Sequence, residues 1–159
     1  MKKGIVWLLA LLVLAGTLTA CSSQKEEKDV DLSAFYGDLA ERYEWGETYM
    51  TDITGESLET YYPGLADIPT KQLVAKMPLM TSVVNEIVLM ECETEDDAAE
   101  AAAILQDRID TQAEGGAFYP ESMEAWGRGV VVQQGSYVAM IASAEHQDEI
   151  VDAFNTLFA

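Results

Sequence analysis

Beyond residue 30, the hydrophobic pattern has helical spacing in three segments. Apolar residues recur every three or four positions from Asp31 to about Glu44, from Thr94 to just before Gly115, and from Glu145 to Phe158. Such spacing places apolar side chains on one face of a helix. We therefore expect three amphipathic helices.

The middle helix has the clearest start. Thr94 is a good N-terminal cap, and the acids Glu95, Asp96 and Asp97 follow where the helix dipole favours negative charge. Asp31 is placed to cap the first helix in the same way. The expected inward stripe of the middle helix consists of Ala98, Ala101, Ala102, Leu105, Ile109 and Gln112.

Other segments have the composition of strands. The stretch 83–92 is rich in apolar and β-branched residues and predicts a central strand. Segments 130–133 and 137–142 flank Gln134-Gly135, a hairpin signal. Residues 72–77, before Pro78, fit a short strand or an extended lead-in. In the segment 45–62, broken by glycines, only a short helix at 57–62 is expected, and 117–129 is expected to be a loop.

The resulting order is α-β-α-β-β-α, which indicates an α+β fold. We expect a small antiparallel or mixed sheet of three to four strands with helices packed on one face. If the strand before the long helix pairs with the strand after it, their crossover should be right-handed.

The first 29 residues have a different pattern. Lys2 and Lys3 precede the apolar run Ile5–Ala15, which ends in Leu18-Thr19-Ala20-Cys21. This layout is typical of a secretory signal peptide and resembles the bacterial lipobox. A spanning helix would need about 20 apolar residues, and a plain secretory signal would leave the cysteine unexplained.

The lipobox resemblance implies cleavage after Ala20 and attachment of diacylglycerol to the Cys21 thiol. We therefore expect a signal peptide at 1–20, a polar tether at 21–29 and a single domain at 30–159. Acyl chains such as palmitate would hold the protein on the extracytoplasmic face of the cell membrane.

Charge narrows the possible partners. The chain has 9 basic and 28 acidic residues. With Lys2 and Lys3 removed, 7 basic residues remain and the net charge becomes −21. Nucleic-acid binding needs a positive surface and is therefore not expected. Contact with the membrane is expected only through the lipid.

Residues suited to catalysis or metal binding are few. His146 is the one histidine, is expected to be exposed, and lacks partners for a catalytic relay. Cys92 lies in an apolar strand between acids and is expected to be buried and inert. We expect no cofactor, no zinc site and no enzyme. A hydrolase using a carboxylate pair and weak divalent-cation binding by the acids at positions 91, 93, 95, 96 and 97 are the alternatives.

Aromatic residues outside the regular elements give the remaining hint. Those residues are Trp45, Tyr49, Tyr61, Tyr62, Phe118, Tyr119 and Trp126. Core closure is the favoured role for the group. A platform for a sugar or peptide is the alternative, and Tyr119 and Trp126 are its candidate ligand surface.

The chain also resembles a family of small bacterial lipoproteins, mostly from Gram-positive gut anaerobes, that carry a domain of unknown function. The resemblance rests on 30–32, 73–78, the acidic helix from Thr94, Tyr119-Pro120 and 131–138, and it covers nearly the whole mature chain. Ser136 departs from the family, which often has an acid in that turn. The resemblance implies export, lipidation and an α+β domain, but no activity.

Together these observations predict a lipid-anchored, extracytoplasmic domain that is non-enzymatic and acts by binding. An envelope protein or another surface component is the expected partner.

Overall fold

A five-stranded sheet forms the centre of the protein, in a computed structural model that describes residues 28–80 and 82–159. The strands are β1 (Met50–Asp52), β2 (Thr70–Pro78), β3 (Asn85–Cys92), β4 (Val130–Gln134) and β5 (Tyr137–Ser143). Their spatial order is β1-β2-β3-β5-β4, and every neighbouring pair is antiparallel. The α+β class is confirmed, with five strands instead of three or four.

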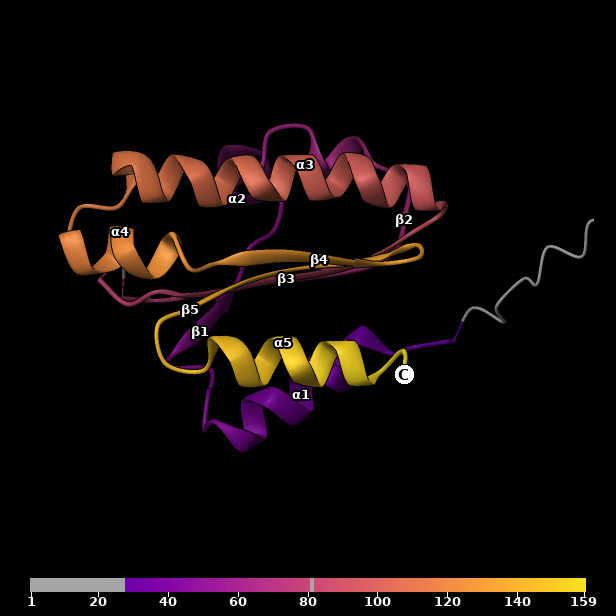
Figure 1. Cartoon of the computed structure of the whole chain (residues 1–159), viewed down its shortest axis with the longest axis horizontal. Helices are drawn as coiled ribbons and strands as arrows, with labels where there is room; N and C mark the ends of the chain where they lie inside the picture. Colours follow the sequence, from indigo (N-terminus) through magenta and orange to yellow (C-terminus); the bar gives the residue numbers. More distant parts are fainter. Residues whose placement is uncertain (1–27, 81) are drawn as a thin grey trace, which may run out of the picture.

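Helices cover both faces of this sheet, which corrects the expectation that they pack on one face (Figure 1). Helices α2 (Glu56–Tyr61), α3 (Glu95–Thr111) and α4 (Pro120–Trp126) lie on one side; α1 (Leu32–Arg42) and α5 (Gln147–Thr156) lie on the other. Two short helical turns, η1 (Leu65–Asp67) and η2 (Gln112–Gly116), lie between α2 and β2 and between α3 and α4.

The central strands explain the two helical layers. All eight residues of β3 and all seven of β5 are buried. Val88 and Met90 belong to the core under α3, whereas Ile87 and Leu89 belong to the core under α1 and α5. A strand that is apolar on both faces needs cover on both.

Helix α3 follows the sequence pattern closely. The Thr94 hydroxyl accepts a hydrogen bond from the Asp97 N–H at 3.1 Å, and the Asp97 carboxylate accepts one from the Thr94 N–H at 3.1 Å. This reciprocal capping box satisfies two backbone donors. Ala98, Ala101, Leu105 and Ile109 are buried, so the expected inward face is confirmed.

Two elements were not expected. Strand β1 is only three residues long and is held by pairing with the end of β2. Helix α4 forms in the expected loop, with Pro120 in its first turn, where the missing N–H costs nothing. Strand β5 lies between β3 and β4, so the condition for a right-handed crossover does not arise.

The described N-terminal segment is fastened to the sheet. The Val30 N–H donates to the Tyr137 hydroxyl at 3.2 Å, and the Gln72 amide donates to the Val30 carbonyl at 2.8 Å. Lys28 donates to the carbonyl of Ala159. The start of the domain and the C-terminus therefore lie at one end of the molecule (Figure 1). Within 28–80 and 82–159, no helix is long and apolar enough to cross a membrane.

Candidate functional site

The end of the sheet away from both chain ends carries two cavities. It is built from the β2–β3 connection, η2 and α4 (Figure 1). Helix α3 ends in η2, where Gly115 has a φ of 128°, a conformation that glycine adopts readily. The Ser122 hydroxyl donates to the Ser82 carbonyl at 3.5 Å and links α4 to the β2–β3 connection.

The wider cavity has a volume of about 430 Å³ and is rich in aromatic residues. Tyr61, Phe118, Tyr119 and Trp126 line it, so the structure brings the two candidate residues together. Tyr119 is 49% exposed, whereas Trp126 is buried at the end of α4. Phe118 is 86% exposed and meets Tyr119 edge-on, with ring centroids 5.1 Å apart.

A buried ion pair forms one wall of this cavity. Arg108 of α3 donates from Nε and Nη2 to the two carboxylate oxygens of Glu86 in β3, at 2.9 and 3.0 Å. The side chains are 12% and 3% exposed, respectively. The Tyr62 hydroxyl donates to the same carboxylate at 2.5 Å. The Glu86 carboxylate therefore accepts three hydrogen bonds, two of them from the bidentate Arg108 guanidinium.

Aromatic rings enclose the Arg108 guanidinium. Its carbon lies 4.9 Å from the ring centroid of Tyr61 and 5.2 Å from that of Trp126. Burial and the negative charge of Glu86 raise the pKa of Tyr62 well above its usual value. Burial acts to lower the pKa of Arg108, but its hydrogen bonds and charge interaction with Glu86 raise it overall. The positive charge of Arg108 and the negative charge of Glu86 therefore neutralise each other within the cavity wall.

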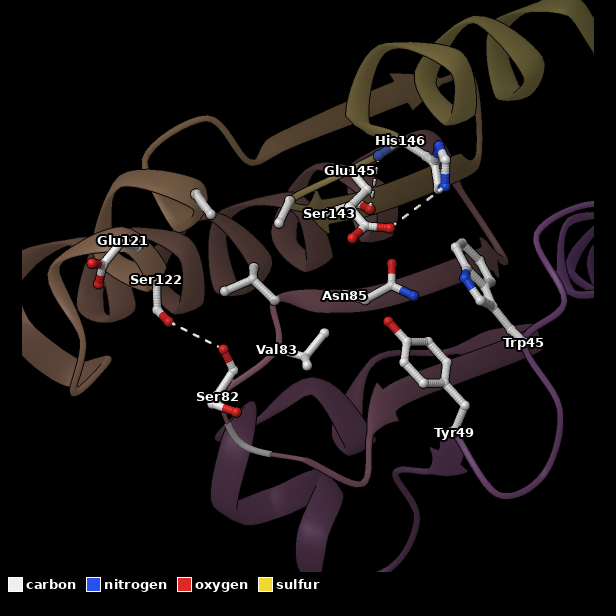
Figure 2. Close-up of a pocket in the computed structure, with 13 residues that line it drawn as sticks. Trp45, Tyr49, Ser82, Val83, Asn85, Glu121, Ser122, Ser143, Glu145 and His146 are labelled. Carbon is white, nitrogen blue, oxygen red and sulfur yellow. Dashed lines mark hydrogen bonds and ion pairs between the residues drawn. The ribbon is translucent and has the colours of Figure 1, made fainter.

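The smaller cavity, of about 220 Å³, surrounds Asn85 at the start of β3 (Figure 2). Trp45 and Tyr49 line one side, and Glu145 and His146 lie on the turn before α5. Asn85 is 3% exposed. Its Nδ2 donates to the Met50 sulfur at 3.5 Å. Among the described residues, its Oδ1 is the one buried side-chain oxygen or nitrogen without a hydrogen-bond partner.

The sequence analysis missed Asn85, Glu86 and Arg108 as site residues. A signal was present, because Asn85-Glu86 places two polar residues at the start of an otherwise apolar strand. Arg108 lies three residues after Leu105 and one before Ile109, next to the buried stripe. Their partners could not be read from sequence, since 22 residues separate Glu86 from Arg108.

His146 differs from its expected exposure. Its ring stacks on Tyr43 with centroids 4.1 Å apart and an interplanar angle of 15°. Nε2 lies 3.9 Å from a Glu145 carboxylate oxygen, and the side chain is half-buried. The turn before α5 folds the ring over the end of α1, which explains the difference. The Ser143 hydroxyl accepts from the His146 backbone N–H at 3.3 Å, so this contact does not form a serine–histidine catalytic pair.

Cys21 lies outside the described residues. Cys92 is buried, as expected, and burial raises the pKa of its thiol to about 11, with smaller contributions from Asp97 and Glu91. A thiol with this pKa is largely protonated at neutral pH and is a poor nucleophile. The expected burial of Cys92 is therefore confirmed, and its low reactivity stays a prediction.

Two of the acids near the start of α3 are engaged in other contacts. Glu91 accepts from Gln72 at 2.6 Å and from Lys71 at 3.2 Å. Asp97 belongs to the capping box. Across 28–80 and 82–159, no group of three or more His, Cys, Asp or Glu side chains is placed to hold a metal ion.

The loop aromatics divide between the two roles considered. Trp45, Tyr62 and Trp126 are buried and close the core, which was the favoured role for the whole set. Phe118 and Tyr119 are exposed at the wider cavity. Trp126 serves both roles, because it is part of the core and also lines that cavity.

Comparison with known protein families gives one match. The model of a family described as "Domain of unknown function (DUF4358)" matches residues 43–143. The matched segment includes all five strands and helices α2, α3 and α4. No match was found among curated proteins or among solved structures.

Proposed function

This chain belongs to the DUF4358 family, and we propose that it is a lipid-anchored, extracytoplasmic domain that binds an envelope protein. The binding site is the wider cavity, and the occupant is an apolar segment of that protein. The supporting observation is the exposed aromatic pair, Phe118 and Tyr119, at a cavity of about 430 Å³.

The chemistry of the cavity suits an apolar side chain. Aromatic rings give a large contact area with little loss of conformational entropy. The Arg108–Glu86 pair in the wall is internally neutralised and does not demand a charged ligand. Leu79 and Met80, which follow the cavity-lining Pro78 along the chain, are also exposed apolar residues. Clustered apolar exposure is typical of protein-binding surfaces.

The buried carboxylates do not favour a hydrolase. Glu86 and Glu91 are the buried acids of the described residues, and both have hydrogen-bond partners. They lie five residues apart on β3 and face opposite sides of the sheet, so about 16 Å separates them along the strand. Acid pairs in glycoside hydrolases lie about 5–9.5 Å apart.

Crosslinking tests the proposed surface. A photoreactive phenylalanine analogue at position 118 in intact cells should give a discrete protein adduct. The matched control carries the analogue at exposed Asp107 on α3, where no such adduct is expected. Adding Tyr119→Ala to the position-118 protein should remove most of the adduct. The same adduct from both positions, or no effect of Tyr119→Ala, would refute the proposed site.

The anchor is tested separately. We expect Cys21→Ala to abolish lipid attachment, so the protein is released from the membrane fraction or remains as an uncleaved precursor. Cys92→Ala is the matched control, since the Cys92 thiol is buried, and it should remain in the membrane fraction. Normal processing and membrane retention of Cys21→Ala would contradict the anchor.

A further inference from the structure

We propose that the smaller cavity around Asn85 binds a small organic ammonium group, such as a primary amine. The inference concerns a different cavity from the proposed protein-binding site and does not depend on it. Three properties of the cavity support it: an acceptor without a donor, two acidic side chains in a lining that holds no lysine or arginine, and aromatic walls.

The acceptor is the Asn85 amide oxygen. Its amide nitrogen donates to the Met50 sulfur, and the side chain also has a hydrogen bond with Tyr49. Figure 2 shows the oxygen turned toward the side of the cavity where Ser143 and Glu145 lie. A buried carbonyl without a partner costs about 1–3 kcal/mol. A ligand that donates a hydrogen bond here recovers that free energy.

The charge of the lining favours a cationic donor. Glu121 and Glu145 line the cavity, and no lysine or arginine does. His146 is the one lining residue able to carry a positive charge, and its Nε2 is 3.9 Å from Glu145. Burial, followed by the charge of Glu145, raises the pKa of Tyr49, and a hydrogen bond with Asn85 partly offsets this rise.

The walls and the volume suit an organic cation. Trp45 and Tyr49 supply aromatic surfaces of the kind that bind ammonium groups. The cavity volume of about 220 Å³ is large enough for a small organic group. A bare metal ion fits poorly, since hard cations need about six or more oxygen ligands.

The test is an NMR titration of the ¹⁵N-labelled processed protein in detergent, with ethylammonium chloride as the probe. We expect saturable shifts of the Asn85 side-chain amide and the Trp45 indole N–H. The Trp126 indole should move little, because Trp126 lines the other cavity. Ethanol tests a neutral donor of similar size, and sodium acetate tests an anion. Both should bind at least about tenfold more weakly, a difference of about 1.4 kcal/mol.

Two variants examine the contributing groups. Asn85→Leu keeps a similar size but removes the acceptor, and saturable ethylammonium binding should be lost. Should that variant fail to fold, the double variant Glu121→Gln/Glu145→Gln changes only exposed side chains and should weaken binding several-fold. Glu56→Gln/Glu59→Gln, an equal charge change on α2, is the matched control and should bind like the unmodified protein.

Several results would overturn the inference. These are no saturation by ethylammonium up to about 100 mM, equal binding of ethanol, unchanged binding by folded Asn85→Leu, and equal weakening by the two double variants. Loss of the position-118 crosslink would leave the inference unaffected, because that experiment reports on the wider cavity alone.

Discussion

The Glu86–Arg108 pair should show strong energetic coupling. We consider three variants: Glu86→Leu, Arg108→Met and the combination. Each single change leaves a charge in a mostly buried site, since the side chains are 3% and 12% exposed. The double change replaces both charges with apolar groups of similar size. Breaking a buried pair is costly, whereas replacing the whole pair can be nearly neutral.

The structure sets the expected magnitudes. Removing one member of such a pair costs about 3–5 kcal/mol. In a domain of this size, that loss lowers the melting temperature by about 10–20 °C. The double variant still leaves the Tyr62 hydroxyl without its acceptor, which costs about 1–3 kcal/mol. The double variant should therefore be more stable than either single variant.

Urea denaturation of the four proteins measures the coupling directly. The matched control is the exposed pair of Glu124 in α4 and Arg128 just beyond its end, with a 3.1 Å contact and Glu124 79% exposed. Its coupling should be about 0.5 kcal/mol or less. Additive losses at Glu86 and Arg108, or single losses below about 1 kcal/mol, would refute the reasoning. A single variant that fails to fold agrees with it only if the double variant folds.

Three further predictions concern the core, the thiol and metal. Leu105→Ala should cost about 2–5 kcal/mol because Leu105 is fully buried, whereas exposed Asp107→Ala should stay within about 0.5 kcal/mol; equal losses in urea denaturation would contradict this packing. Cys92 should resist alkylation in the folded protein and react in denaturant. Folding raises the pKa of its thiol from 9.0 to about 11, so the unfolded chain releases this proton at lower pH and the free energy of unfolding falls as pH rises through that interval. Cys92→Ala should therefore lose less stability between these pH values, and an equal slope for the two proteins would count against this reasoning. Chelator should leave the melting temperature unchanged, and a loss restored by zinc would contradict the expected absence of a structural metal.

Local signals were sufficient for several elements. The capping box at Thr94 and the stripe through Leu105 lie within single stretches of sequence, so the course of α3 was predictable. The Gln134-Gly135 turn likewise indicated the β4–β5 hairpin. Such features depend on neighbours in the chain, and sequence periodicity reports them directly.

Features that depend on distant residues were not predictable in the same way. The three residues of β1 form a strand through their pairing with β2. Helices on both faces follow from the two-sided burial of β3 and β5, which their apolar runs suggested but did not specify. Tyr119 and Trp126 were predicted as ligand candidates. The Glu86–Arg108 ion pair beside them was not, because it joins a strand to a helix. The unpartnered oxygen of Asn85 could not be predicted either, because its surroundings come from segments that are distant in the sequence.

The fastening of Val30 to Tyr137 and Gln72 has a consequence for orientation. It fixes the point at which a lipid tether would join the domain, at the same end as the C-terminus. Helix α3 runs along the molecule from that end to the cavities, and its 17 residues span about 25 Å. Under the proposed lipid attachment at Cys21, both cavities lie at the opposite end of the domain from the tether, about the length of α3 away from it.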